Sequence, residues 1–137
     1  MVRFIAGGKG EGKTKLLIEK ANQQQKITDG NLVFIDDDRR ITSDLNYNIR
    51  FIEAGRGFLS NYREFAGFLL GILAMDNDIK TVYIDGLTNI IAKLESDDLI
   101  KLGKRLNYLS EKNEVEFIAC INWKTDELPD EIKKLLI

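Results

Sequence analysis

The sequence predicts an α/β domain, built as a three-layer sandwich in which helices cover both faces of a mostly parallel sheet of four to five strands. Two observations lead to this prediction. Short apolar runs alternate along the chain with longer segments whose apolar residues recur at helical spacing. The apolar runs are almost unbroken, which is typical of parallel strands buried on both faces. A length of 137 residues, 44% of them hydrophobic, predicts a single domain over residues 1–137.

The strands follow from the apolar runs. We expect strands at residues 2–6, 32–35, 81–84 and 115–121, and a short edge strand at 48–54, where the alternation of apolar and polar residues is incomplete. One order would place the fourth of the main strands between the first and third, whereas another would make the first and third neighbours. The sequence leaves both orders open.

The helices follow from apolar residues at helical spacing and from their capping residues. We expect helices at residues 13–25, at 61–75 with Ser60 as N-cap, at 97–112 with Ser96 as N-cap, and from Pro129 through Leu136. The second helix contains Gly67 and Gly71, a spacing that we expect to allow close packing on the sheet.

The residues between the first strand and the first helix have the spacing G-x-x-x-x-G-K-T of a phosphate-binding loop. Glycines allow the backbone N–H groups to converge on an anion, which the positive end of the following helix dipole also attracts. Lys13 would carry a full charge to the outer phosphates, and the Thr14 hydroxyl would ligate a magnesium ion. The candidate nucleotide-binding residues are Gly7, Gly8, Lys9, Gly10, Glu11, Gly12, Lys13 and Thr14.

Polar residues follow the other buried strands. Since parallel sheets bind ligands beyond the carboxyl ends of their strands, we expect Asp85 and Asn122 to lie near the loop, with Asp85 serving the metal ion. The second strand ends in three carboxylates, residues 36–38. One of them would orient or deprotonate an attacking water, or all three are solvated turn residues paired with Arg39 and Arg40. Both interpretations stay open.

Composition excludes several classes of function. The chain has no histidine, which removes Ser-His-Asp and Cys-His nucleophilic pairs and imidazole-based zinc sites. A net charge of −2 argues against a surface built for nucleic acid. The longest uncharged apolar run, residues 65–75, is too short to cross a bilayer, and no leader opens the chain, so we expect a cytoplasmic protein. The single cysteine, Cys120, agrees with that compartment.

The order of these motifs resembles the core of RecA-like P-loop ATPases. In that family the second strand ends in F-I-D-A-E with a catalytic glutamate, the third in I-D-S-L, and the fourth in I-N-Q; this chain has F-I-D-D-D, I-D-G-L and I-N-W. The resemblance implies a P-loop NTPase fold of minimal RecA-like form, with Asp38 and Lys13 as catalytic residues, Asp85 for the metal ion and Asn122 as sensor of the γ-phosphate. The whole chain is also similar to small bacterial P-loop ATP-binding proteins without an established function.

Three departures separate the chain from the RecA-like pattern. Asp38 is one methylene shorter than the family's glutamate, Trp123 replaces the glutamine, and Glu11 adds a negative charge to the loop. The family's DNA-contacting segments have no counterpart, so its DNA transaction does not carry over.

We therefore expect a protein that binds ATP with Mg²⁺ and hydrolyses it slowly, acting through self-assembly or a protein partner. The alternative is a regulatory module that binds nucleotide without hydrolysing it. Residues 122–126 read N-W-K-T-D, which resembles the guanine-reading N-K-x-D motif with one extra residue, so GTP binding is a further alternative. Nucleotide kinase activity is another.

Overall fold

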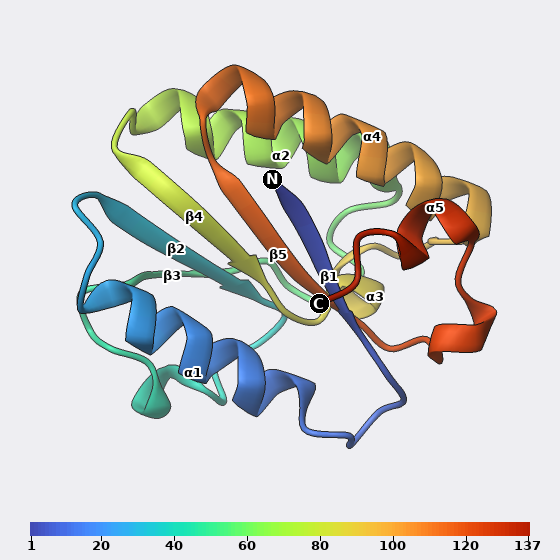
Figure 1. Ribbon diagram of the computed structural model, residues 1–137, viewed down its shortest axis with the longest axis horizontal. Helices are drawn as coiled ribbons and strands as arrows, with labels where there is room; N and C mark the ends of the chain where they lie inside the picture. Colours follow the sequence, from blue (N-terminus) through green and yellow to red (C-terminus); the bar gives the residue numbers. More distant parts are fainter.

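The computed structural model describes all 137 residues and contains one five-stranded sheet in which every neighbouring pair of strands is parallel. Helices lie on both faces of the sheet, with α1 on one face and α2 and α4 on the other (Figure 1). The predicted α/β class and three-layer arrangement are therefore confirmed. The strands are β1 (Val2–Ala6), β2 (Asn31–Asp36), β3 (Arg50–Glu53), β4 (Ile79–Ile84) and β5 (Glu116–Ile121). The helices are α1 (Lys13–Gln25), α2 (Tyr62–Met75), α3 (Leu87–Ile90), α4 (Ser96–Asn113) and α5 (Asp130–Lys133), with 3₁₀ turns η1 (Thr42–Asp44) and η2 (Thr125–Glu127).

The interior strand β2 shows why an unbroken apolar run forms a strand in this sheet. Successive side chains of a strand point to opposite faces. Leu32 and Phe34 accordingly join the smaller core under α1, whereas Val33 and Ile35 join the larger core under α2 and α4. All four are at most 1% exposed, because helices cover both faces of the sheet.

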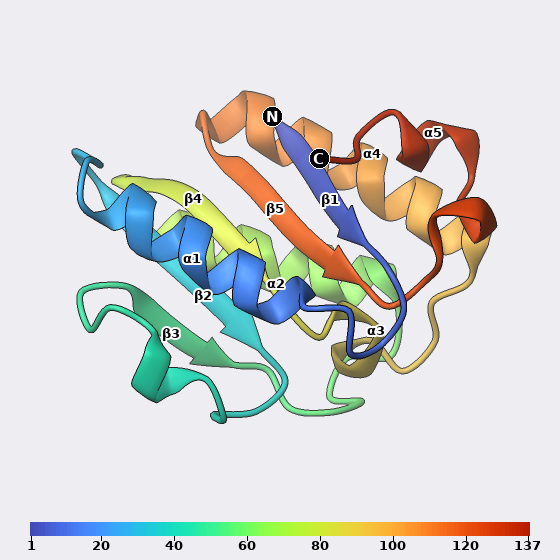
Figure 2. The same cartoon turned by 60° about the horizontal axis from the view of Figure 1, so that its bottom comes forward.

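The strand order is β1-β5-β4-β2-β3. Of the two orders that the sequence leaves open, the structure thus has the one in which the fourth main strand, β5, lies between β1 and β4. All five strand arrows point to the edge of the sheet that carries the Gly-rich loop and α3 (Figure 2). The incompletely alternating segment at 48–54 is indeed an edge strand, β3, paired with β2 alone.

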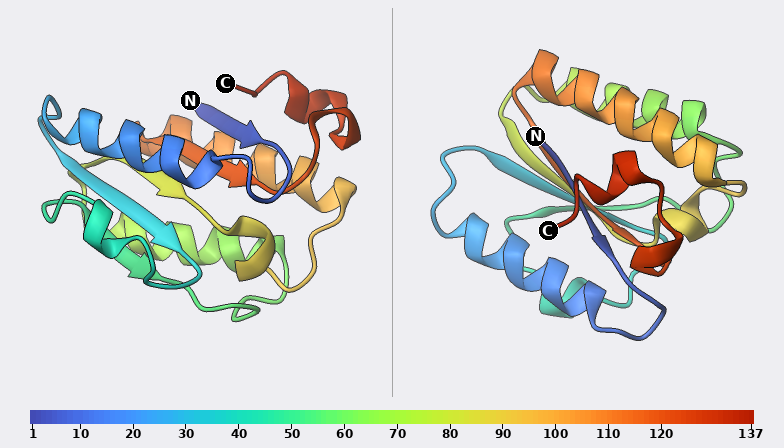
Figure 3. Two further views of the ribbon diagram at one scale, coloured as in Figure 1. Left: turned by 90° about the horizontal axis from the view of Figure 1, so that it is seen from below. Right: turned by 45° about the vertical axis from the view of Figure 1, so that its right-hand side comes forward.

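The segment after α5 differs from the prediction. We expected a helix through Leu136, but α5 ends at Lys133 and the chain then runs beside β1 (Figure 3). Phe4 N–H donates to the Leu135 carbonyl at 2.9 Å, and Ile137 N–H donates to the Phe4 carbonyl at 3.0 Å. The free edge of β1 offers these backbone groups partners, which outweighs the helical propensity of so short a segment.

Helix α2 starts one residue later than predicted and turns its glycines outward. Its N-cap is Asn61, whose side chain accepts from Glu64 N–H at 3.0 Å, while the Glu64 carboxylate accepts from Ser60 N–H at 2.8 Å. Gly67 and Gly71 are exposed, and a Cβ added to either would meet no atom within 4 Å. The expectation that they permit close packing on the sheet is wrong.

Helix α4 is capped by Glu95 rather than by Ser96. The Glu95 side chain accepts from the backbone at the third helical position, and the Asp98 carboxylate accepts from Glu95 N–H at 3.0 Å. This reciprocal capping box satisfies two amides, whereas a serine cap would satisfy one. None of the helices has the length and apolar character that a membrane span requires.

Candidate functional site

A cavity of about 850 Å³ lies at the carboxyl edge of the sheet. The loop after β1, the first turns of α1 and the residues that follow β2, β4 and β5 line it. Its lining includes five residues of the Gly-rich loop, namely Lys9, Gly10, Gly12, Lys13 and Thr14. The other three, Gly7, Gly8 and Glu11, lie outside the lining, so the loop presents only part of its length to the cavity.

The backbone of the loop requires glycine at two of the cavity-lining positions. Gly10 has a φ of 86° and Gly12 a φ of 81°, in the left-handed region that side-chain-bearing residues rarely adopt. Gly12 is also the N-cap of α1, and no side chain caps that helix. The first amides of α1 therefore remain available at the cavity, where the helix dipole favours an anion.

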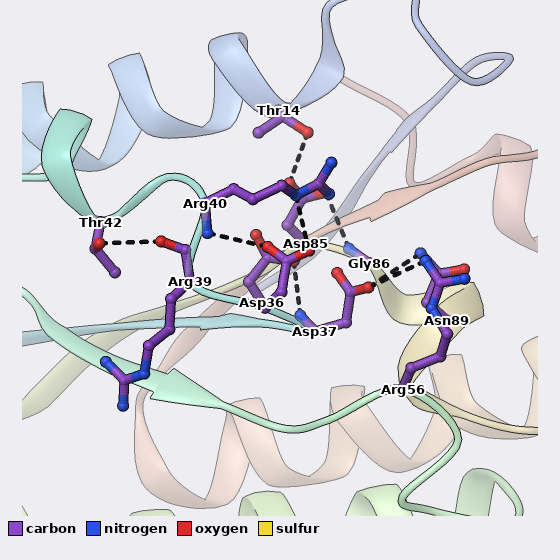
Figure 4. Close-up of polar contacts among 11 residues, drawn as sticks. Thr14, Asp36, Asp37, Arg39, Arg40, Thr42, Arg56, Asp85, Gly86 and Asn89 are labelled. Carbon is purple, nitrogen blue, oxygen red and sulfur yellow. Dashed lines mark hydrogen bonds and ion pairs between the residues drawn. The ribbon is translucent and has the colours of Figure 1, made fainter.

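Lys13 and Thr14 are the first two residues of α1 and point in different directions. The Lys13 side chain is buried, and its Nζ donates to the Gly8 carbonyl at 2.7 Å, which folds the ammonium group back over the loop. The Thr14 hydroxyl donates to Asp85 Oδ2 at 2.7 Å (Figure 4). Helix α1 thus joins the loop to the end of β4 through one direct contact.

Asp85 comes directly after β4 and is fixed from both sides. Its second carboxylate oxygen accepts from Gly86 N–H at 2.9 Å. Gly86 has a φ of 68°, and a Cβ at this position would lie 2.5 Å from Asp37 Oδ1. The absent side chain therefore lets the end of β4 approach the carboxylates that follow β2.

Two of the three consecutive carboxylates enter the cavity. Asp36 and Asp37 line it and are buried, and Asp36 Oδ1 accepts from Asp37 N–H at 2.7 Å. Burial raises the pKa of Asp36 to about 8, with further contributions from the side chain of Asp37 and the charge of Asp85, whereas the backbone hydrogen bond from Asp37 opposes them. Burial therefore favours the protonated form of Asp36 in the metal-free site.

Asp37 lies at the junction of three segments. Its Oδ2 accepts from Asn89 Nδ2 in α3 at 3.3 Å and lies 3.7 Å from Arg56 Nη2 in the loop after β3 (Figure 4). Asn89 also lines the cavity, whereas Arg56 does not. A carboxylate oriented by a neutral amide can hold a water molecule or an ion in a fixed place.

Asp38, the candidate catalytic residue, does not line the cavity. Its Oδ1 accepts from Arg40 N–H at 3.0 Å, and its Oδ2 lies 2.7 Å from Arg40 Nε. The backbone hydrogen bond from Arg40, followed by the side-chain contact, lowers the pKa of Asp38. Its catalytic role stays a prediction, and the geometry favours Asp36 and Asp37 as the carboxylates that meet a ligand.

The residues after β5 complete the edge of the cavity. Asn122, the candidate sensor, lines it, and the Trp123 carbonyl accepts from Gly7 N–H at 2.9 Å, which fixes the start of the loop. Asp126, the last residue of the sequence that resembles the guanine-reading motif, lies in η2 and does not line the cavity. The geometry therefore gives the guanine-reading hypothesis no support.

Sequence reasoning left several cavity residues unassigned. Asn89 gave no signal, because α3 is a single turn that no apolar periodicity marks. Arg40 was one of several arginines with no distinguishing pattern. Asp36 could have been chosen before Asp38, since it is the last residue of a buried strand and such residues meet the ligand edge of a parallel sheet.

Comparison with known proteins assigns the chain to no family. No protein-family model matches the chain, and no curated protein matches it in sequence.

Proposed function

We propose that the protein binds ATP with Mg²⁺ at this cavity and hydrolyses it slowly, as a small RecA-like P-loop ATPase. One observation carries the proposal: the Thr14 hydroxyl contacts Asp85 at 2.7 Å, directly beside a Gly-rich loop whose Lys13 folds over it. A loop that binds phosphates and a hydroxyl–carboxylate pair that binds magnesium are the two parts that nucleoside triphosphate binding requires. Both are on one cavity wall.

The oxygens present fit a magnesium ion. Mg²⁺ prefers oxygen ligands at about 2.0–2.1 Å in an octahedron, so neighbouring ligand oxygens lie about 3 Å apart. Thr14 Oγ1 and Asp85 Oδ2 are separated by 2.7 Å, close to that spacing. These two residues would hold the ion, and Asp36 adds a further carboxylate on the same wall. When bound, the ion would neutralise charge on the two outer phosphates.

The strand order supports the RecA-like form of the proposal over the kinase-like one. Strand β5 lies between β1 and β4, so Asn122 at its end comes between the loop and Asp85. This is where a residue that senses the terminal phosphate would have to lie. In a kinase-like order β1 and β4 would be neighbours, and the end of β5 would lie elsewhere.

Hydrolysis requires a group that orients water, and we propose Asp37 for this role. It lines the cavity and is oriented by Asn89. The alternative, a module that binds nucleotide without hydrolysing it, is favoured by the pairing of Asp37 with Arg56 and of Asp38 with Arg40, because an arginine beside a carboxylate competes with water for its oxygens. Assembly or a protein partner that displaces Arg56 would then stimulate turnover.

Thermal denaturation with Mg-ATP, Mg-GTP or sodium sulfate tests the proposal. A ligand at one hundred times its dissociation constant that binds only the folded state should stabilise it by about 2.7 kcal/mol. For a domain of this size that corresponds to roughly 9 °C. Mg-ATP should give this shift, while sulfate should give a smaller one.

The matched variants are Lys13→Ala and Lys104→Ala, of which the second removes an exposed lysine of α4 far from the cavity. Lys13→Ala should abolish the shift, and Lys104→Ala should retain it. Equal shifts in both variants would refute nucleotide binding by the loop. Phosphate release by the unaltered protein but not by Asp37→Asn, at equal nucleotide affinity, separates the ATPase from the binding module.

A further inference from the structure

Arg40 is the only arginine that lines the cavity. It follows β2 by four residues, and it lines the cavity together with Thr14 and Asp85. Its side chain is 76% exposed, so it enters the cavity from the solvent side. A cation therefore faces the wall that carries the buried carboxylates Asp36 and Asp85.

Asp38 holds Arg40 at two points. One carboxylate oxygen accepts from the Arg40 backbone N–H at 3.0 Å, and the other lies 2.7 Å from Nε. Both the start and the middle of the Arg40 side chain are thus fixed by one neighbour. The two terminal guanidinium nitrogens make no hydrogen bond within the chain, and they are the donors that bind phosphate oxygens in a planar fork.

The adjacent arginines are placed differently. Arg39 Nε donates to Glu53 at 3.0 Å and its guanidinium lies 5.6 Å from the centre of the Phe51 ring, so it is tied to β3. Arg56 is paired with the buried Asp37. Neither lines the cavity, which leaves Arg40 as the guanidinium with free donors at the site.

Arg40 and three buried carboxylates line the same cavity, and a magnesium ion bound there would offset part of the charge of the carboxylates. Asp36, Asp37 and Asp85 are all buried and line the cavity. The hydrogen bond with Asp38, and then the charges of Asp38, Asp37 and Asp36, raise the pKa of Arg40. Thr14 and Asp85 would hold the magnesium ion, and Arg40, whose side chain is exposed, is the guanidinium in the same cavity that a phosphate could meet.

We propose that Arg40 binds the terminal phosphate of a nucleoside triphosphate from within the same chain, and that Asp38 is the positioning residue that aims its guanidinium. This inference rests on the proposed nucleotide binding. It gives Asp38 a role other than that of a base, and it makes Arg40 the residue that distinguishes a triphosphate from a diphosphate. No second subunit is needed to supply this arginine.

The test measures, by calorimetry in Mg²⁺, the affinities for ADP and for a non-hydrolysable ATP analogue. A hydrogen-bonded contact to a charged phosphate is worth about tenfold or more in affinity. Arg40→Ala should therefore lower the preference for the triphosphate by about tenfold and leave ADP affinity unchanged. Arg40→Lys should restore part of it, since lysine keeps the charge but lacks the fork. The matched control Arg39→Ala should behave as the unaltered protein.

Asp38→Asn and the double variant Asp38→Asn/Arg40→Ala test the positioning role. If Asp38 acts through Arg40, Asp38→Asn should weaken triphosphate preference, and the double variant should be no worse than Arg40→Ala alone. A base would instead lower turnover without changing that preference. Additive losses, or equal behaviour of Arg40→Ala and Arg39→Ala, would overturn the inference while leaving nucleotide binding intact. An unaltered protein that binds neither nucleotide would overturn both proposals.

Discussion

Replacing Gly86 by alanine tests how tightly the carboxylates at the carboxyl ends of β2 and β4 are packed. Gly86 has a left-handed φ of 68°, which costs a non-glycine residue about 1 kcal/mol. The new Cβ would lie 2.5 Å from Asp37 Oδ1, so Asp37 must move. That movement breaks its 3.3 Å hydrogen bond from Asn89, a contact to a charged group worth about 2 kcal/mol. We expect Gly86→Ala to lower the free energy of unfolding by about 3 kcal/mol, or roughly 10 °C in midpoint.

The measurement is urea unfolding followed by circular dichroism, with Gly67→Ala as the matched control. A Cβ at Gly67 would meet no atom within 4 Å, and alanine is favoured in a helix, so this variant should be about 1 kcal/mol more stable. A Gly86→Ala protein as stable as the unaltered one would show that Asp37 is free to move. The site would then not be held in the form described here.

Three further predictions concern charge and access at the site. In metal-free protein, Asp36 should contribute its full stabilisation below its ordinary pKa of 3.8, and this stabilisation should be lost as the pH rises to about 8, because the folded state holds the proton more tightly. The difference in urea stability between the unaltered protein and Asp36→Asn should therefore change over this pH range. A difference that stays constant with pH would contradict the prediction. Glu11→Gln should strengthen ATP binding by about two- to fivefold at low salt and less at high salt, since the exposed Glu11 carboxylate folds against Gly7 and Gly8. An affinity that is unchanged in calorimetry would show that this carboxylate lies too far from the phosphates. Cys120 is buried beneath Lys13 with a raised pKa, so a disulfide reagent should modify it only at the rate of protein opening, and fast labelling in native buffer would contradict the burial.

The four main strands could be predicted because each apolar run is buried on both faces and ends at a polar residue, whereas their order in the sheet could not. The start of α1 was predicted correctly, but the N-caps of α2 and α4 could not be. Ser60 and Asn61 are both good N-caps, as are Ser96 and the Glu95–Asp98 pair, and only the direction of the incoming chain decides which side chain meets the free amides. The outward turn of Gly67 likewise depends on which face of α2 meets the sheet.

At the site, the loop and Asp85 were predictable because their spacing and position fix their geometry. The choice among three consecutive carboxylates was not. Asp36 still belongs to the strand, Asp37 turns toward Asn89, and Asp38 turns back onto Arg40. The turn that separates them depends on contacts from α3 and from the residues after β3, which lie far away in the sequence.

The strand that leads into the Gly-rich loop, β1, has no partner near it in the chain. Val2 pairs with Phe117 on one side, and on the other side Phe4 is bonded to Leu135 and Ile137. During synthesis on the ribosome, β1 must therefore wait, without hydrogen-bonded neighbours, until β5 has emerged. A ligand of the cavity cannot assist the early steps of folding, because the cavity is among the last parts of the molecule to form.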